Sequence, residues 1–330
     1  MDNVTHTLVG VAMANAFFRK RIGKGAVPIL AIASNLPDID AFVVLTGDPT
    51  AILMRRTFGH SLLLLPIWVF ILSLIFRRFY PEQRFGTLFG LTLLGAGVHL
   101  FFDLVNSFGV VLLWPFSDWR PELGIVFIID LFLTGVLAAP LFLSRLPLFK
   151  TTLARLSQCS ILIASLYIGL CGVARIKAGQ FLEKAANGPV DFRYVFPEPL
   201  GPHRWKGVSR EGNTYRIYLI NPITGRVDLR EEEKTEIDDL RVVQAREKPL
   251  ARRLEWFFKA PVWQVEKDPK RDPITFGEWS GEETPTEMKD AVLRSPSQPI
   301  EVRVYDLRFK TILIGRTTPF VFRFKVEPAS

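Results

Sequence analysis

The sequence predicts a polytopic α-helical membrane domain of about six helices, followed by a small β-rich extramembrane domain. Residues 1–174 contain 13 Lys and Arg and 9 Asp and Glu, whereas residues 175–330 contain 28 and 24. Several apolar segments in the first part approach the roughly 20 residues that cross a bilayer. We therefore place the membrane domain at residues 1–175 and the β-rich domain at residues 176–330.

The expected helices are residues 4–18, 26–45, 60–76, 86–106, 124–144 and 153–174. Asn3 is the expected N-cap of the first helix, and Pro37 should end or kink the second near Leu36. These two helices are short for full spans, so one or both could be half-buried or re-entrant. Cys159 and Cys171 lie about 18 Å apart along the last helix and cannot form a disulfide.

Basic residues predict the orientation of these segments. If the turn after the first helix is cytoplasmic, that side receives ten basic residues and the opposite side receives three. Because cytoplasmic loops are enriched in Lys and Arg, residues after 175 should lie outside the cytoplasm. The ten are Arg19, Lys20, Arg21, Lys24, Arg77, Arg78, Arg84, Arg145, Lys150 and Arg155, and the three are Arg55, Arg56 and Arg120. The net charge of +8 arises largely from such loops, so no nucleic-acid partner is indicated.

The second part alternates apolar and polar residues as strands do. Residues 215–220 predict a strand followed by a turn at 221–225, and residues 320–326 predict another strand. A phase change around Tyr305 suggests a bulge. Residues 230–239 read as a charged, solvated connection, and residues 268–299 as a loop.

Histidines and carboxylates gather at one predicted depth of the membrane domain. His6 and His60 each begin a helix on the outer side, whereas His99 and Asp103 lie near the outer end of another. Asp38 and Asp40 follow the second helix on that side, and Asp130 lies about two turns inside the fifth. Ionisable groups in hydrocarbon are costly and survive mainly where they pair, line a cavity or bind something. The pattern predicts a metal site at the outer membrane interface.

Spacing supports this site, because His99, Asp103 and Asn106 share one helical face. Imidazole and carboxylate ligands suit Zn better than Ca, with Mn or Fe as alternatives, and either one ion or a bridged pair is possible. For three single residues a purely structural role is the alternative. Asn106 could be a helix cap, His6 an interhelical hydrogen-bond partner, and Asp130 the partner of an arginine. His203 is expected on the surface of the soluble part.

Several motifs resemble those of the bacterial inner-membrane metal-dependent hydrolase family. They are Met1-Asp2-x-x-Thr5-His6-x-x-x-Gly10, the stretch Ser34–Asp40, Gly59-His60-Ser61-Leu62, His99-x-x-x-Asp103-x-x-Asn106-Ser107-x-Gly109, Trp114-Pro115-Phe116-Ser117 and Phe127-Ile128-Ile129-Asp130. The likeness covers about residues 1–145. One departure is Arg55, which stands where the family often has a histidine, and an arginine cannot be a metal ligand.

The resemblance implies an integral hydrolase whose divalent metal activates a water molecule. We expect His60, His99 and Asp103 as ligands, with Asp38, Asp40 and His6 next. Either Asp40 or Asp130 would act as general base. The expected anion-binding groups are Arg56, Arg55 and Arg120, since guanidinium groups suit phosphate, with Asn106 also near the substrate. A site at headgroup depth favours a lipid or lipid-linked phosphoester, ester or amide.

Two other classes remain open from the sequence. A metal-ion or proton-coupled transporter would use the same residue types, although transporters place them near the bilayer midplane. A membrane-stress or assembly protein without catalysis would use the cluster only structurally. Metal in the purified protein would argue against the latter, and turnover without a gradient would separate hydrolase from transporter.

Overall fold

The computed structural model describes residues 1–46, 51–146, 152–186, 188–266, 300–312 and 320–326. Its contacts divide the chain into two compact units, which are described separately below. The first is formed mainly by Met1–Ala178, and the second holds most of the chain from Gly179 onward. The expected boundary after residue 175 stays a prediction, because short segments near residues 200 and 223 group with the first unit.

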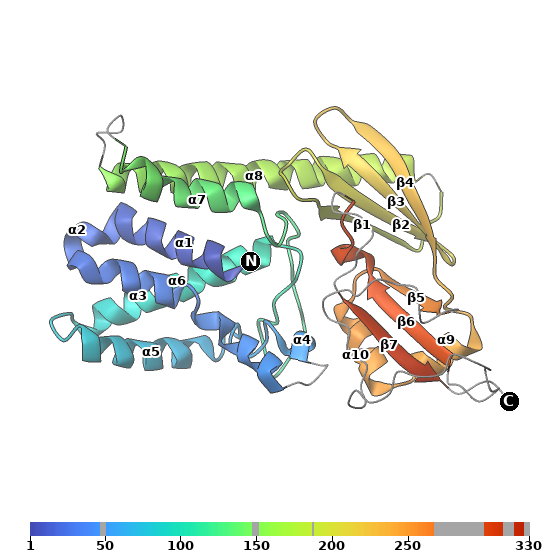
Figure 1. Ribbon diagram of the computed structural model, residues 1–330, viewed down its shortest axis with the longest axis horizontal. Helices are drawn as coiled ribbons and strands as arrows, with labels where there is room; N and C mark the ends of the chain where they lie inside the picture. Colours follow the sequence, from blue (N-terminus) through green and yellow to red (C-terminus); the bar gives the residue numbers. More distant parts are fainter. Residues whose placement is uncertain (47–50, 147–151, 187, 267–299, 313–319, 327–330) are drawn as a thin grey trace, which may run out of the picture. The chain divides into compact units, whose positions relative to one another are not determined.

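The chain begins with a helical hairpin, seen in blue in Figure 1. Helix α1 (Asn3–Met13) continues through a π-helical turn (Ala14–Phe18) and α2 (Arg19–Ile22) into a short 3-10 turn (Gly23–Gly25), and α3 (Ala26–Ala33) returns beside α1. The expected N-cap, Asn3, was wrong by one residue, because the Asp2 carboxylate accepts the Thr5 backbone N–H at 3.0 Å. A short cap side chain in extended backbone satisfies such an orphan donor.

The second expected helix ends close to where Pro37 predicts. Helix α3 stops at Ala33, and the chain continues as 3-10 helix over Leu36–Thr46. A proline lacks a backbone N–H and disfavours α-helical geometry in the residue before it. Asp38 and Asp40 accordingly lie on the tighter 3-10 backbone. A single turn, α4 (Ala51–Met54), follows.

Four more helices complete the first unit: α5 (Leu65–Phe79), α6 (Phe85–Val105), α7 (Leu131–Leu143) and α8 (Leu153–Ala185). Helix α7 starts seven residues later than expected because Asp130 caps it, accepting the Leu133 backbone N–H at 2.9 Å. Helix α8 extends past the expected residue 174, since the sequence after Arg175 is polar but still rich in helix-forming residues. Cys159 and Cys171 both lie on α8 as free thiols.

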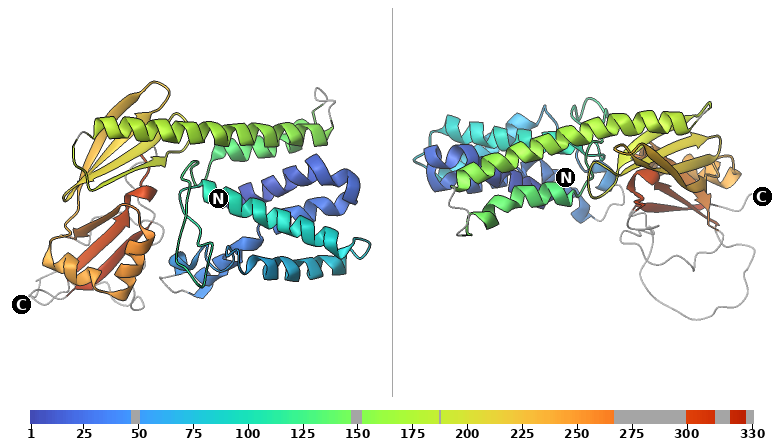
Figure 2. Two further views of the ribbon diagram at one scale, coloured as in Figure 1. Left: turned by 180° about the vertical axis from the view of Figure 1, so that it is seen from behind. Right: turned by 90° about the horizontal axis from the view of Figure 1, so that it is seen from above.

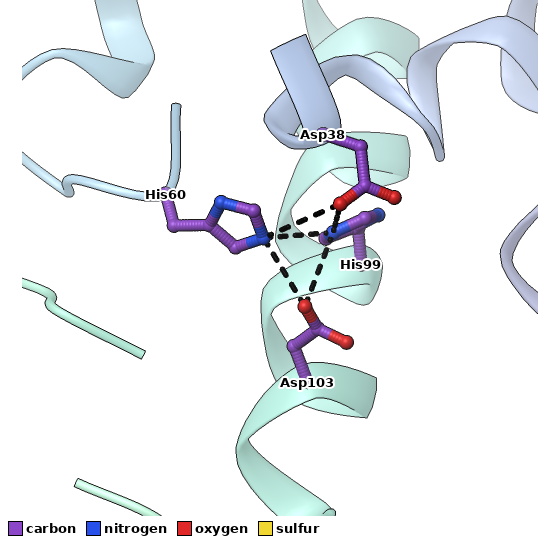
Figure 3. A group of neighbouring side chains, drawn as sticks. All are labelled: Asp38, His60, His99 and Asp103. Atoms are coloured by element: carbon purple, nitrogen blue, oxygen red, sulfur yellow. Dashed lines mark hydrogen bonds and ion pairs between the residues drawn. The ribbon is translucent and has the colours of Figure 1, made fainter. Parts of the chain in front are cut away.

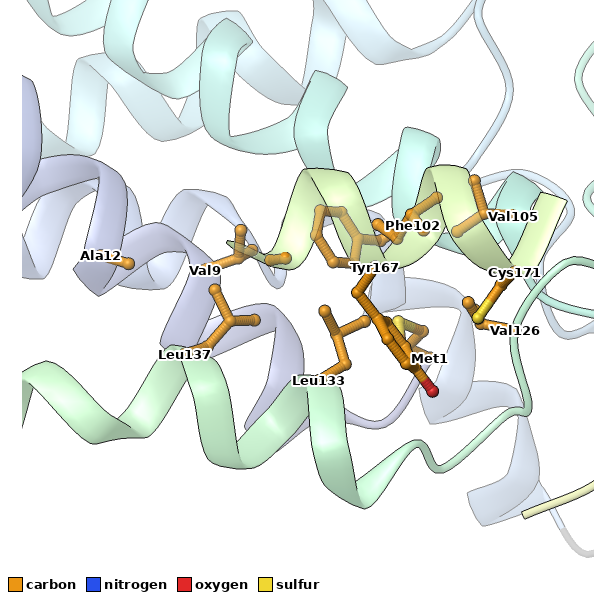
Figure 4. Packing of buried hydrophobic residues seen from close by; sticks show 12 residues of the cluster. Met1, Val9, Ala12, Phe102, Val105, Val126, Leu133, Leu137, Tyr167 and Cys171 are labelled. Carbon is orange, nitrogen blue, oxygen red and sulfur yellow. The ribbon is translucent and has the colours of Figure 1, made fainter. Parts of the chain in front are cut away.

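Three stretches are long and apolar enough to cross a membrane: Asn3–Val43, Phe85–Val105 and Leu153–Ala185. Helix α7 is apolar but shorter. The expected number of about six spans is therefore not confirmed among the described residues. Apolar side chains from α1, α6, α7 and α8 pack into one buried cluster that includes Val9, Phe102, Leu133 and Leu137 (Figure 4).

The second unit confirms the β-rich prediction with two antiparallel sheets, drawn in yellow and in orange to red in Figure 2. Four strands lie in sequence order in the first sheet: β1 (Phe192–Pro197), β2 (Trp205–Glu211), β3 (Thr214–Asn221) and β4 (Arg226–Lys234). The second orders β5 (Pro261–Val265), β6 (Ile300–Asp306) and β7 (Val321–Val326). Two helices, α9 (Leu240–Arg246) and α10 (Pro249–Phe257), lie between the sheets in sequence.

The strands expected at 215–220 and 320–326 are present as β3 and β7, and two other expectations were wrong. Residues 230–234 belong to strand β4 rather than to a solvated connection, because alternate charged residues can occupy the exposed side of a strand. The phase change near Tyr305 marks the end of β6, followed by a 3-10 turn at Leu307–Phe309. The register shift lies instead between Ile217 and Tyr218. Residues 268–299 lie outside the described residues.

Candidate metal centre

Four buried side chains from three separate segments converge in the first unit (Figure 3). They are Asp38 from the 3-10 segment, His60 from the turn before α5, and His99 and Asp103 from α6. One potential ligand atom from each lies within 4.8 Å of all the others. The i, i+4 spacing places His99 and Asp103 one helical turn apart on the same face, as the sequence predicts.

The distances fit a small tetrahedral cation. His60 Nε2 lies 3.1 Å from both His99 Nε2 and Asp103 Oδ2. His99 Nε2 lies 3.5 Å from Asp103 Oδ2, and Asp38 Oδ1 lies 4.0 and 3.9 Å from the two histidine nitrogens. Ligands about 2.0–2.1 Å from a tetrahedral ion are roughly 3.3 Å apart. Asp38 Oδ1 would have to move inward by roughly 0.7 Å to reach this separation from the two histidine nitrogens.

Hydrogen bonds behind the two imidazoles fix their orientation. The Nδ1 of His60 lies 2.8 Å from Asp40 Oδ2, and the Nδ1 of His99 donates to the Ser34 carbonyl at 2.7 Å. Both acceptors need a proton on Nδ1, so the two Nε2 atoms are the ring atoms left to face each other at 3.1 Å. A bound cation or a shared proton between these nitrogens would stabilise this close approach. This arrangement is the usual way in which carboxylate and carbonyl groups orient histidine ligands.

Close backbone approaches bring the three segments together. At Gly59 an added Cβ would overlap the Pro37 carbonyl, so only glycine lets the His60 turn lie directly against the Asp38 segment. At Gly95 a Cβ would come within 2.6 Å of Ala33 Cβ, which lets α6 approach the end of α3 closely. The Asp40 carboxylate also accepts the Thr57 backbone N–H at 2.9 Å, tying the same two segments.

Replacing Gly59 with alanine should therefore displace His60. Overpacking of this kind costs about 1–3 kcal/mol, and if that cost falls on the metal-binding arrangement, metal affinity should drop roughly fivefold or more. Gly86→Ala is the matched control, since nothing lies within 4 Å of a Cβ built at Gly86. Metal titration of both purified variants measures the effect, and equal affinities would contradict this role of the Gly59 contact.

Arg56 lies inside the cluster rather than at its mouth. It is 4% exposed, its Nε lies 2.8 Å from Asp103 Oδ2, and its Nη1 donates to Asn106 Oδ1 at 2.9 Å. Its guanidinium also stacks over the Phe108 ring at 4.6 Å. Burial lowers the pKa of Arg56, and Asp103 acts against that shift. Arg56 thus balances the negative charge of the carboxylate cluster.

Asn106 combines the two roles that the sequence leaves open. It is the C-cap residue of α6 in extended backbone, and its Oδ1 also accepts the Phe108 backbone N–H at 2.8 Å. Its Nδ2 donates to Asp103 Oδ1 at 3.3 Å. Asn106 therefore holds both Arg56 and Asp103 in position at the end of the helix.

His6 contacts the cluster from its other side. Its Nε2 lies 3.1 Å from Asp103 Oδ1, the oxygen that points away from His60, and its ring stacks on His99 with centroids 3.6 Å apart. His6 is not among the four converging ligands, and its buried Nδ1 has no hydrogen-bond partner in the described part of the chain. The α-amino group of Met1 also contacts Asp103.

The remaining predicted site residues lie in different settings. Both carboxylate oxygens of Asp130 are engaged, one by the α7 backbone and one by the Tyr167 hydroxyl at 2.7 Å. Asp130 therefore pairs with Tyr167 rather than with an arginine. Arg55 is 32% exposed and lies 4.0 Å from Asp38 Oδ1, whereas Arg120 donates to the Arg55 carbonyl at 3.0 Å. His203 is exposed in the second half of the chain, as expected.

Sequence reasoning missed the Ser34 carbonyl and the backbone of Thr57. Backbone acceptors and donors carry no residue-type signal, so neither could be found from composition. Gly59 was part of a quoted motif, yet its contact with Pro37 needs the tertiary structure.

Comparisons with known proteins find a matching family and a curated relative. Residues 1–178 match the family described as YdjM inner membrane protein. An uncharacterized protein of Bacillus subtilis strain 168, YfhP, is 33% identical over 140 residues. That match covers 40% of this chain and 43% of YfhP, so the chain spans less than half the length of this relative. No solved structure matches the chain.

The family match covers more than half of the chain and contains all four converging residues, Asp38, His60, His99 and Asp103. It confirms the family expected from the sequence motifs. The chain belongs to the YdjM inner membrane protein family.

Proposed function

We propose that this protein is an integral membrane metal-dependent hydrolase that acts on a lipid or lipid-linked substrate. The observation that carries the proposal is the buried convergence of two imidazole nitrogens and two carboxylate oxygens, three of them on stretches that can cross a membrane. Such ligands suit zinc, with manganese or iron as alternatives. A metal there would polarise the scissile group and lower the pKa of a water molecule toward neutrality.

Carboxylates beside the cluster can accept the proton that the attacking water loses in such a reaction. Asp38 Oδ2 and Asp40 Oδ1 are buried and have no hydrogen-bond partner among the described residues. Each can accept a proton beside the cluster, which makes Asp40 a better candidate for general base than Asp130, whose two oxygens are occupied. A proton accepted close to the reacting atoms accelerates hydrolysis by roughly 10²–10⁴.

Arg55 is the best placed group for an anionic part of the substrate. Its side chain is one third exposed near Asp38, whereas Arg56 is buried and engaged with Asp103. Arg120 donates a hydrogen bond to the backbone carbonyl of Arg55, so the Arg120 guanidinium group lies beside the Arg55 backbone. Guanidinium groups bind phosphate and carboxylate in a bidentate manner, so a phosphoester headgroup is the preferred substrate, ahead of other esters or amides.

The proposal is tested by metal-dependent turnover in detergent. Purified protein is incubated with membrane lipids, with and without a chelator, and the products are identified by mass spectrometry. Hydrolysis that disappears with chelator and in His99→Ala, but persists in His203→Ala, is the expected result. If metal-loaded protein cleaves no lipid ester, phosphoester or amide, yet concentrates metal inside sealed vesicles, the transporter hypothesis replaces the hydrolase.

We further propose that the membrane is crossed several times and that the β-rich unit lies outside the cytoplasm. The support is the ten-to-three distribution of basic residues around the helices. This orientation puts the His and Asp cluster at the outer interface, where lipid headgroups are available.

A cysteine introduced at Glu211 should report this orientation, because Glu211 is exposed at the end of β2. The two native thiols, Cys159 and Cys171, are first replaced by serine. A membrane-impermeant thiol reagent should label the new cysteine in intact cells stripped of any outer membrane barrier. Labelling only after lysis would reverse the topology.

A further inference from the structure

An apolar groove lies among the helices of the first unit. Side chains from four helices line it, for example Val9 of α1, Phe101 of α6, Leu137 of α7 and Ala164 of α8. Its volume is about 240 Å³, and an apolar cavity of about 150 Å³ already holds a benzene ring. The one hydroxyl among these lining side chains, on Ser165, already donates its proton to the Ile161 carbonyl of its own helix.

The groove opens toward the lipid side of the helices. Phe17 and Phe101 belong to its wall and are 51% and 49% exposed. They lie on two of the stretches that can cross a membrane, and Ala164 lies on the third. Within a bilayer such an opening meets acyl chains rather than water, so the matching occupant is a saturated or unsaturated hydrocarbon chain.

The groove lies close in sequence to residues of the metal centre on two helices. On α6 its wall residues Val98 and Phe102 directly adjoin His99 and Asp103 in sequence. On α1, Val9 lies one turn beyond His6, and the wall continues to Phe17, about 12 Å further along the helix. The buried end of this wall appears in Figure 4, where Val9, Phe102 and Leu137 lie in one cluster.

We propose that this groove binds one acyl chain of a membrane lipid and thereby places the lipid headgroup at the His and Asp cluster. The inference deepens the proposed function, since it rests on a lipid substrate and names how that lipid is held. It also makes a prediction that needs no turnover, because binding of the chain is set by the groove and not by the metal.

Photo-crosslinking tests the groove directly. The probe is a phosphatidylethanolamine with a diazirine in the middle of one acyl chain, incorporated with the protein into nanodiscs. Peptide mapping should find labels enriched on the groove residues Met13, Phe17 and Phe101 over lipid-facing residues outside the groove. Uniform labelling of all lipid-facing helix surfaces would overturn the proposal.

Filling the groove should remove the enrichment. Ala164→Trp places an indole inside it, and Ser165→Phe narrows it from an exposed position with less repacking. Either variant should lower labelling of the groove residues at least fivefold and leave bound metal unchanged. Leu166→Trp is the matched control, because Leu166 is 65% exposed on the same helix outside the groove. Unchanged labelling in a folded Ser165→Phe protein would contradict the proposal.

The two proposals fail in different ways. If groove labelling is lost in Ser165→Phe but no lipid is ever hydrolysed, acyl-chain binding stands and the hydrolase proposal falls. If lipids are hydrolysed with a chelator-sensitive rate that neither groove variant changes, the hydrolase stands and the groove proposal falls.

Discussion

Replacing His99 with alanine should reduce the metal bound to the purified protein at least tenfold. The imidazole supplies one of four converging ligand atoms, and the Ser34 carbonyl orients it for that purpose. Removing one of four ligands leaves an open position that water fills less tightly than a pre-oriented nitrogen. Metal analysis after purification at neutral pH, together with titration of the stripped protein, measures the loss.

His203→Ala is the matched control, since this exposed histidine lies in the other half of the chain. Asp40→Asn separates a supporting group from a ligand. It keeps an acceptor beside His60 Nδ1 but removes the charge, so metal affinity should fall by roughly 10–100-fold, and added metal should restore occupancy. If all three variants retained as much metal as the unchanged protein, no metal site would exist at this cluster.

The sequence predicted the ligand types well because helical spacing and topology constrain them. His99 and Asp103 share a face through the i, i+4 rule, and Pro37 moved Asp38 and Asp40 out of regular helix. Asp38 and Asp40 have different roles because their side chains point in different directions from the 3-10 segment. The spacing of the two residues in the sequence does not determine these directions. One aspartate points into the cluster, and the other lies behind His60.

Arg56 and Asp130 show where sequence reasoning stops. A buried arginine and an exposed one look alike in sequence, and the positive-inside count treats Arg55 and Arg56 equally. Only the tertiary structure shows that Arg56 lies against Asp103 with a positive φ of 58°. Asp130 precedes an apolar helix as an ordinary N-cap does, yet its depth in the membrane made it resemble a site residue.

Two of the expected membrane helices, now α5 and α7, are shorter than their apolar composition suggests, for a related reason. Hydropathy measures apolar composition, whereas a span also needs an unbroken helix of sufficient length. Helix α5 begins only at Leu65, because the residues from His60 to Leu64 form the turns that present the histidine to the cluster. Residues 60–64, which apolar composition assigns to the helix, therefore belong to the site instead.

Replacing Arg56 with methionine should destabilise the metal-free protein by about 3–5 kcal/mol, because it leaves Asp103 buried without its main counter-charge. Asp103 is fully buried, and the Arg56 guanidinium lies 2.8 Å from it. Bound metal supplies positive charge at the same carboxylate, so the destabilisation should shrink when the protein is saturated with zinc. Denaturant unfolding in one detergent, with and without metal, measures both values.

The double variant Arg56→Met/Asp103→Leu distinguishes an ion pair from a general packing defect. Because it removes both members of this ion pair, it should recover part of the lost stability. The recovery is partial, since the Met1 α-amino group, His6 and Asn106 lose their contact with Asp103. Metal binding stays abolished with the Asp103 ligand gone. Recovery of stability without recovery of metal would show that Asp103 serves both partners. A double variant no more stable than Arg56→Met alone would mean that packing of Arg56 over Phe108, rather than charge, holds this part of the cluster.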